Sequence, residues 1–207
     1  MPSTDKPPGP LKPWQFLVYE LALDLTAAPR DRIDAARRDR PAAVDIVSLS
    51  SLLDADPSSA ERAYALHSEC YRLQPPAMAH DEPIPYHLWR WGSIEARGEA
   101  LPDAYFVAVE GNDFVGLSTV VQQLRLPGVL QSRFTGVLPA HRNRGIACLL
   151  KAETIAYALD HGYRELRATV LADNAPMLHL NESFGFQRRR EYVIAYPHLT
   201  FEKRFTA

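Results

Sequence analysis

The sequence has no apolar run that approaches the roughly 20 residues needed to cross a bilayer. Its first 13 residues are rich in proline and contain no hydrophobic signal core, so nothing in them suggests export. Only two cysteines occur, Cys70 and Cys148, and they lie far apart in the sequence. We expect both to be reduced thiols, and the sequence therefore predicts a cytoplasmic protein with no membrane partner.

An excess of charge of one sign is also absent. The 23 lysines and arginines nearly balance the 25 aspartates and glutamates, which leaves a net charge of −2. Nucleic-acid binding and attachment to anionic membranes usually depend on basic patches, so this balance supports neither partner. The seven histidines are scattered without metal-binding spacing, and no internal repeat occurs. The sequence predicts no metal.

What is present is enough for one globular domain and an appendage. The chain has 207 residues, of which 46% are hydrophobic, an ordinary fraction for a folded domain with a real core. We expect the main domain over residues 43–207 and an N-terminal extension over residues 1–42.

The most informative stretch is the loop from Arg142 to Ala147, which follows a turn at Pro139 and precedes an apolar-striped helix. A loop that opens a helix offers free backbone N–H groups and the positive end of the helix dipole, which together suit a phosphate. Gly145 allows close approach of a ligand, and Arg144 can form a planar fork with a phosphate. The Gly-Lys-Ser/Thr of a P-loop and the three glycines of a dinucleotide loop are both missing. The loop therefore predicts a different pyrophosphate site.

The segments around the loop have clear secondary structure. Residues 129–137 have strand character, and an apolar stripe at helical spacing continues from Ile146 to Leu159. A second strand follows at residues 165–171, and then a segment from Asn174 to Phe186 contains a short helix and a Gly-Phe pair.

These two segments carry a resemblance to a known family. Arg142-Asn143-Arg144-Gly145-Ile146-Ala147 resembles the acyl-coenzyme A loop of the GCN5-related N-acetyltransferases, Arg/Gln-x-x-Gly-x-Gly/Ala, at every fixed position. The segment from Asn174 to Phe186 resembles the second signature of the same family. The resemblance covers roughly residues 43–196. It implies an α/β fold, a central mixed sheet flanked by helices, and transfer of an acetyl group from acetyl-coenzyme A (acetyl-CoA) to an amine.

The resemblance also implies roles for individual residues. The pantetheine arm would pair with the backbone of one strand in a gap where that strand splays from residues 165–171, and a backbone N–H near Val137 would hold the thioester oxygen. Asn174 would contact the cofactor or an ordered water, and it would also suit a helix N-cap. The expected cofactor-binding residues are Thr135, Gly136, Val137, Arg142, Asn143, Arg144, Gly145, Ile146, Ala147 and Asn174.

The catalytic residues depart from the family pattern. Many members carry a tyrosine acid four residues before the Gly of Gly-Phe, but this chain has Asn181, which could only donate a hydrogen bond to the sulfur. Water, the thiolate's own low basicity, or Tyr192 or Tyr196 would then replace the acid. For the general base we favour Glu82, acting directly or through a water, although a segment such as His80-Asp81-Glu82 is more often a solvated polar loop.

The rest of the main domain is predicted to begin with a strand at residues 43–48, followed by helices at 58–73 and 84–98 and a hairpin of strands at 105–110 and 114–122. Trp89, Arg90 and Trp91 mark the second helix. They would either bind a substrate carboxylate or belong to an ordinary amphipathic helix.

The N-terminal extension contains an alternating strand at residues 14–25 and a charged helical segment at 29–40. It resembles the tail of a missing first domain in tandem members of the family. The strand would either cap an edge of its own sheet or pair with a sheet in another subunit, which predicts a possible homodimer.

The sequence therefore predicts an N-acetyltransferase that uses acetyl-CoA and acts on the primary amine of a small molecule by direct attack in a ternary complex. Two alternatives stay open: the same chemistry on a protein or peptide amine, and a module that binds acyl-CoA without turnover. The sequence fixes neither the amine nor the length of the acyl group.

Overall fold

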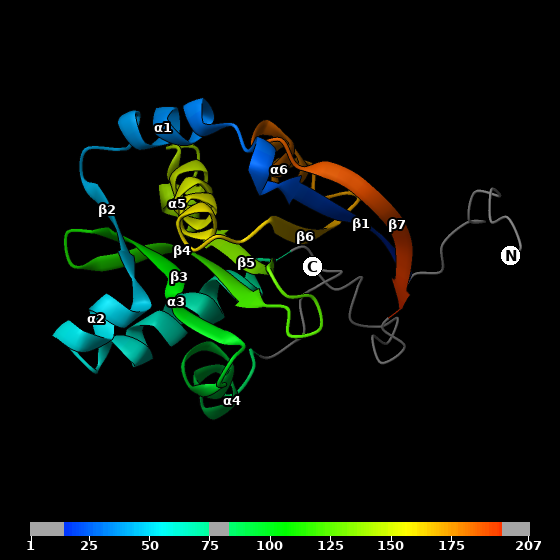
Figure 1. The fold of residues 1–207 in the computed structure, drawn as a ribbon. Coiled ribbons are helices and arrows are strands. Elements are labelled where there is room, and N and C mark those ends of the chain that lie inside the picture. The colour runs from blue at the N-terminus through cyan, green and yellow to red at the C-terminus, as the bar shows by residue number, and fades with distance from the viewer. Residues whose placement is uncertain (1–14, 75–82, 196–207) are drawn as a thin grey trace, which may run out of the picture.

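A seven-stranded mixed sheet crosses the computed structural model, which describes residues 15–74 and 83–195 (Figure 1). The strand order is β2-β3-β4-β5-β6-β1-β7, and only β5 and β6 run parallel to each other. The strands are β1 (Gln15–Asp24), β2 (Val44–Ser48), β3 (Ala100–Glu110), β4 (Asp113–Gln122), β5 (Val129–Val137), β6 (Glu165–Leu171) and β7 (Gln187–Ala195).

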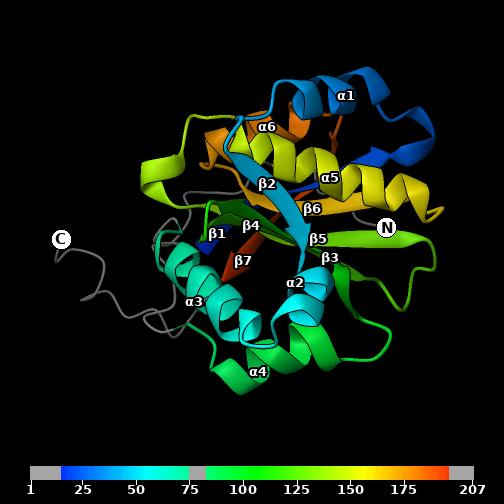
Figure 2. The ribbon, with the colours of Figure 1, turned by 90° about the vertical axis from the view of Figure 1, so that its left-hand side faces the viewer.

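Helices cover both faces of this sheet. One face carries α1 (Arg30–Arg38), α5 (Ile146–Asp160) and α6 (Ala175–Ser183), and the other carries α2 (Leu49–Ala55), α3 (Ser59–Arg72) and α4 (Tyr86–Arg90), as Figure 2 shows. The predicted fold class, a mixed sheet with helices on both sides, is confirmed. Within the described residues no helix is long and apolar enough to cross a membrane.

The pairing of β5 with β6 is short. Residues 129–132 of β5 pair with residues 165–168 of β6, and Ser132 opposite Ala168 is the last pair. The remainder of β5 pairs only with β4, on its other side. One edge of β5 therefore faces open space beyond Ser132, as expected for a splayed strand.

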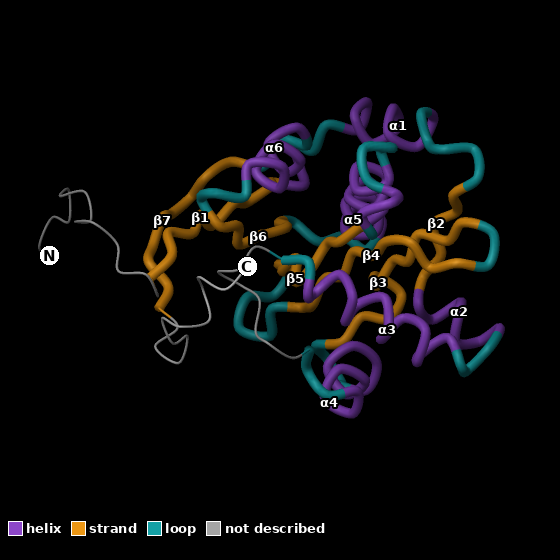
Figure 3. Tube along the Cα trace, turned by 180° about the vertical axis from the view of Figure 1, so that it is seen from behind, coloured by secondary structure: helices purple, strands orange, loops and turns teal. Residues whose placement is uncertain are grey.

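The strand β1 lies inside the sheet. It pairs with β6 on one side and with β7 on the other, and β1 and β7 run side by side through a curved ribbon in Figures 1 and 3. Its side chains Val18 and Leu21 are completely buried. The prediction that this strand caps an edge of its own sheet is wrong, because both of its backbone edges are occupied. Its exchange between subunits stays a prediction.

The helix α1 belongs to the same core. Ile33 and Ala36 are buried in one cluster with Ile155 of α5. At the surface the Arg37 guanidinium forms a two-pronged ion pair with the Glu153 carboxylate, at 2.8 and 2.7 Å. The segment from β1 to α1 is therefore packed as part of the domain.

Three elements differ from their prediction. The single helix expected at residues 84–98 is instead the five-residue α4, which starts after Pro85 and passes into a π-helical turn at Trp91–Glu95. The strand β3 starts at Ala100, earlier than expected. The helix α2 had not been predicted, although the Ser48 hydroxyl accepts a hydrogen bond from the Ser51 N–H and so caps its first turn.

Candidate active site

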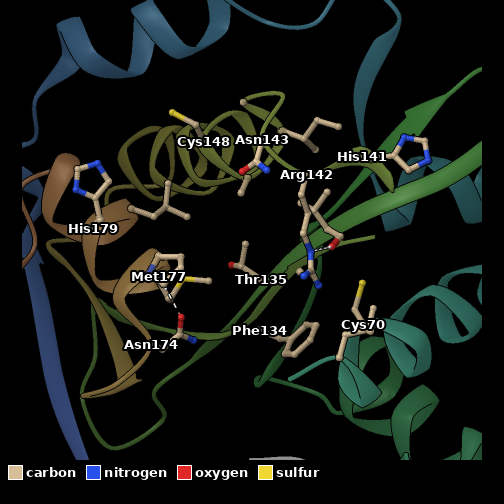
Figure 4. A pocket seen from close by; sticks show the side chains of 18 of the residues that line it. Cys70, Phe134, Thr135, His141, Arg142, Asn143, Cys148, Asn174, Met177 and His179 are labelled. Carbon is tan, nitrogen blue, oxygen red and sulfur yellow. Dashed lines mark hydrogen bonds between the residues drawn. The ribbon is translucent and has the colours of Figure 1, made fainter. Parts of the chain in front are cut away.

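A cavity of about 840 Å³, here called the large cavity, lies beside the open edge of β5 (Figure 4). Most of its wall comes from β5, from the loop and first turn of α5, and from α6. Arg32 of α1 and Cys70 of α3 complete the wall, so elements from both faces of the sheet meet here. The cavity is reached from both faces of the sheet because β5 separates from β6 beyond Ser132.

The loop before α5 has the geometry of an anion site. Gly145, with φ of +81°, precedes the first turn of α5, and no side chain caps that turn. A Cβ added at Gly145 would meet nothing within 4 Å, so the loop faces open space. Asn143 also adopts positive φ, at 59°, which asparagine tolerates better than most residues. The free N–H groups and the dipole of this 15-residue helix therefore fit a phosphate.

The two arginines of the loop have different surroundings. Arg142 lines the large cavity, and its Nε donates a hydrogen bond to the Val137 carbonyl oxygen at 3.0 Å. Arg144 does not line the cavity. Its guanidinium grips both carboxylate oxygens of Glu110, at 2.6 and 3.0 Å, and these hydrogen bonds lower the pKa of Glu110. The Arg144 guanidinium, which we expected to bind a phosphate, thus binds the Glu110 carboxylate instead. His141 is a further partner of Glu110.

A third arginine, which the sequence did not reveal, lines the large cavity together with Arg142. Arg32 lines the large cavity beside the first turn of α5, where its Nη2 lies 3.1 Å from the Cys148 sulfur. Its guanidinium also stacks over the Phe184 ring, 5.1 Å from the centroid. Because Arg32 and Cys148 are 116 residues apart in the sequence, no local pattern could have predicted this contact.

The backbone of β5 offers polar groups to the large cavity. The Leu138 N–H donates to the Val115 carbonyl oxygen of β4 at 2.9 Å. Successive residues of a strand point their backbone groups to opposite sides, so the N–H groups of Val137 and Thr135 point away from β4. Thr135, Gly136 and Val137 all line the cavity, as predicted for residues beside a bound ligand.

Gly136 brings α3 close to this strand. A Cβ at Gly136 would lie 2.9 Å from the Cβ of Cys70, so any larger residue would push the helix away. Burial raises the pKa of the Cys70 thiol to about 12, which keeps it protonated. Cys70 is therefore a packed thiol and not a nucleophile.

Asn174 fills the position expected for it. Its Oδ1 accepts a hydrogen bond from the Met177 N–H at 3.3 Å and caps α6, while the residue also lines the large cavity. The capping interaction and a cofactor contact are compatible, because the side chain borders the cavity from the start of the helix.

A second cavity of about 110 Å³, here called the slot, lies between the diverging parts of β5 and β6. It shares Thr135, Asn174 and Met177 with the large cavity, so the two adjoin. Asn181 lines the slot and is only 1% exposed. Its Nδ2 donates to the Met177 carbonyl oxygen at 2.8 Å, and its Oδ1 has no hydrogen-bond partner among the described residues.

Lys151 of α5 also lines the slot, and sequence reasoning missed it. It is 1% exposed, and burial lowers the pKa of its amine to about 8. A signal was present, because Lys151 is the only basic residue between Ile146 and Asp160 and falls among the apolar residues of that helix.

The residues expected to act as base or acid are the least constrained by the structure. Glu82, together with its neighbours at 80 and 81 and Tyr196, lies outside the described residues. Tyr192 is 40% exposed on β7 and lines neither cavity. No metal-binding group of His, Cys, Asp and Glu occurs among residues 15–74 and 83–195.

The Trp-Arg-Trp sequence of the second early helix divides between core and surface. Trp89 is 1% exposed and packs in an aromatic cluster with Tyr64 and Tyr105. Arg90 pairs with Glu95 at 2.7 Å, and Trp91 is 57% exposed. None of the three lines the large cavity or the slot, which favours the amphipathic-helix interpretation.

A family model matches more than half of this chain. The family model described as "Acetyltransferase (GNAT) family" matches residues 60–186. No curated protein matches the sequence.

Solved structures share the fold. A GCN5-related N-acetyltransferase from Sphaerobacter thermophilus aligns with a TM-score of 0.63 at 19% identity, covering 88% of this chain and 51% of that one. A tandem GNAT protein from the clavulanic acid biosynthesis pathway aligns with a TM-score of 0.58 at 18% identity, over 86% and 52%. AAC(6′)-Iy, in complex with the bisubstrate analogue CoA-S-monomethyl-acetylneamine, aligns with a TM-score of 0.53 at 20% identity, over 74% and 96%. The chain spans about half the length of the first two proteins.

Proposed function

The chain belongs to the acetyltransferase (GNAT) family, and from this premise we propose that it transfers an acetyl group from acetyl-CoA to the primary amine of a small molecule. The predicted family is thereby confirmed, and its members are N-acetyltransferases that use an acyl-CoA. The choice of acetyl as the acyl group and of a small molecule as the acceptor belongs to the proposal.

One observation carries the proposal: the large cavity joins an anion site at the start of α5 to the gap between β5 and β6. A ligand that fits both ends needs phosphates at one end and a long polar arm leading to its reactive group. Acyl-CoA has that form. When bound, it supplies a thioester carbonyl carbon that an amine can attack.

The phosphates would be held by this chain's cations and helix end. The N–H groups in the first turn of α5, from Ile146 to Cys148, face the loop that Gly145 opens. Arg142 and Arg32 supply positive charge from two sides of the large cavity. Arg144 supplies only its backbone to this arrangement, since Glu110 holds its side chain.

The backbone of β5 would position the reacting group. The Thr135 and Val137 N–H groups point away from β4 and can bind amide or thioester oxygens. A fixed N–H donor near a developing oxyanion stabilises the transition state, and we assign this role to Val137. Direct attack then requires the neutral amine to lie beside the thioester carbon in a ternary complex.

The small-molecule acceptor is proposed from a solved structure with the same fold, and the general base from the sequence. The structure of AAC(6′)-Iy holds the bisubstrate analogue CoA-S-monomethyl-acetylneamine. The alignment with this chain covers 96% of AAC(6′)-Iy. We retain Glu82 as the proposed base from the sequence alone. Asn181 borders the slot but carries no acidic proton, so it can contribute only hydrogen bonding.

The first test is thiol release from acetyl-CoA across a panel of amino acids, polyamines, aminoglycosides and peptides. Gly145→Glu places a carboxylate in the anion site and should abolish release. The matched control is Gly162→Glu, because Gly162 also has positive φ and open space around its Cβ but lies at the other end of α5. Both variants carry the same backbone strain, so only the blocked site distinguishes them.

The outcome separates the alternatives. Release with small amines that is lost in Gly145→Glu and kept in Gly162→Glu supports the proposal. Release with peptides alone would establish a protein or peptide acetyltransferase instead. Binding of acetyl-CoA without release on any amine would favour a non-catalytic acyl-CoA-binding module.

The proposal extends to a homodimer and to a cytoplasmic location. Exchange of β1 between two copies would preserve its pairing with β6 and β7, so the same contacts would hold a dimer together. Light scattering gives the solution mass directly, and a monomer mass at all concentrations would contradict the exchange.

A further inference from the structure

The buried amine of Lys151 lines the slot but has been given no chemical role so far. Its side chain is 1% exposed, and no carboxylate of the described residues lies within salt-bridge distance of it. Burial is the sole cause of its lowered pKa, which means that no nearby charge compensates the ammonium. A buried lysine without a counter-ion costs stability, so its place needs another explanation.

Its position is at the point where the two strands separate. The Lys151 Nζ lies 3.5 Å from the Ser132 hydroxyl, and Ser132 is the last residue of β5 that pairs with β6. The amine therefore lies at the closed end of the slot. Asn181, whose Oδ1 lacks a partner, lines the same slot, and the Phe186 ring lies 5.4 Å from Nζ.

We propose that Lys151 is the catalytic acid that protonates the thiolate released during acyl transfer. The inference rests on the proposed function, which directs the pantetheine arm into the gap between β5 and β6. The Lys151 ammonium would supply the proton that the amide of Asn181 cannot supply.

The amine nitrogen bonds to the thioester carbon, the carbon–sulfur bond breaks, and its electron pair stays on sulfur. The Lys151 ammonium gives one proton to that sulfur and becomes a neutral amine. The proton that the acylated nitrogen loses goes to the general base, for which Glu82 is proposed, and from there to solvent. A proton from solvent restores the Lys151 ammonium.

No other side chain of the slot suits this role. Arg133 is the only other charged residue there; it is exposed, and its guanidinium does not release a proton. The hydroxyls of Ser132, Thr135 and Thr169 and the amides of Gln74, Asn174 and Asn181 are not acids near neutral pH. The ammonium is protonated at pH 7 yet easier to deprotonate than an exposed lysine, which is what a general acid requires.

Two substitutions separate proton donation from simple charge. Lys151→Met keeps the length of the side chain and removes the amine, and the loss of an unpaired buried charge should leave the fold intact. Lys151→Arg keeps a positive charge that cannot donate a proton. Thermal unfolding and calorimetric titration with coenzyme A show whether each variant folds and binds.

Activity gives the first readout. We expect kcat with acetyl-CoA to fall about a hundredfold in both variants, with KM for acetyl-CoA little changed. The fall should shrink with acetyl thioesters whose thiols are more acidic, because such leaving groups need no proton. A kcat retained by Lys151→Arg, or a fall that is equal for all leaving groups, would overturn the proposal.

The second readout needs no turnover. Ultraviolet absorbance follows the ionisation of the coenzyme A thiol when it is bound to the protein. We expect the pKa of the bound thiol to be lower in the wild type than in Lys151→Met by about one unit or more, because the ammonium stabilises the thiolate. Equal values would overturn the proposal. Since this readout requires only coenzyme binding, it stands apart from a failure to find an acceptor amine.

Discussion

Three arginines near the large cavity differ in the contacts that their guanidinium groups make within the protein. Arg32 and Arg142 border the cavity, whereas Arg144 is committed to Glu110 by two hydrogen bonds. A guanidinium that must leave a carboxylate before it binds a phosphate contributes little net binding free energy, because one ion pair replaces another. Two arginines therefore remain to bind phosphate in the large cavity: Arg142 from the loop and Arg32 from α1.

This arrangement predicts an order of effects on acetyl-CoA binding. Arg142→Gln and Arg32→Gln should each weaken binding about tenfold or more, because a charge-assisted hydrogen bond to phosphate contributes about 1.5–3 kcal/mol. Arg144→Gln should change the affinity by less than about threefold. Calorimetric titration gives the three dissociation constants. A larger loss in Arg144→Gln than in the other two would mean that the side chain leaves Glu110 on binding.

Among the elements, β1 is an interior strand of the sheet although it comes first in the chain. It separates β6 from β7, and it carries buried residues at Val18 and from Leu21 to Leu23. Leu21 is completely buried, while its neighbour Glu20 pairs with Arg190 at 3.0 Å at the surface. The two residues thus test opposite faces of one strand.

We expect Leu21→Ala to lower the free energy of unfolding by about 2–5 kcal/mol, since it removes a buried side chain from the main core. Glu20→Ala should change it by less than about 1 kcal/mol, because a surface ion pair contributes little. Chemical denaturation followed by circular dichroism gives both values. Similar losses in the two variants would be incompatible with β1 as an interior strand of this sheet.

Elements that depend on local signals could be predicted from the sequence. The loop before α5, the helix itself and the cap at Asn174 each follow from residues close in the chain. The place of β1 could not, because alternation shows that a strand has an apolar face and not which strands flank it. Arg32 could not be predicted either, because its contact with Cys148 joins residues 116 positions apart. Lys151 did leave a local signal, a single basic residue in an apolar helix, but the sequence does not show which strands surround it. Glu82 stays a prediction.

At the scale of the whole molecule, stability should depend on His67. This residue is 9% exposed among aromatic rings, and burial lowers its pKa to about 4 from an ordinary value of 6.5. Between these two values the unfolded chain binds a proton that the folded chain does not. The folded state therefore loses stability as the pH falls from 6.5 towards 4, and is unaffected by this group above that range.

We expect the free energy of unfolding to fall by about 2 kcal/mol between pH 7 and pH 5 through this residue. His67→Phe should lose that part of the pH dependence, while His87→Gln, at an exposed histidine of α4, should retain it. Denaturation at the two pH values measures the difference. An unchanged pH dependence in His67→Phe would show that the histidine is hydrated or paired in the folded protein.

The loop before α5 is the part of the molecule that we propose binds the phosphates of an acyl-CoA. Calorimetric titration of acetyl-CoA into the wild type, Gly145→Glu and Gly162→Glu tests it most directly, because binding is measured without an acceptor amine. We expect saturable binding to the wild type and to Gly162→Glu, and none to Gly145→Glu. No binding to the wild type, or equal binding to both variants, would contradict it.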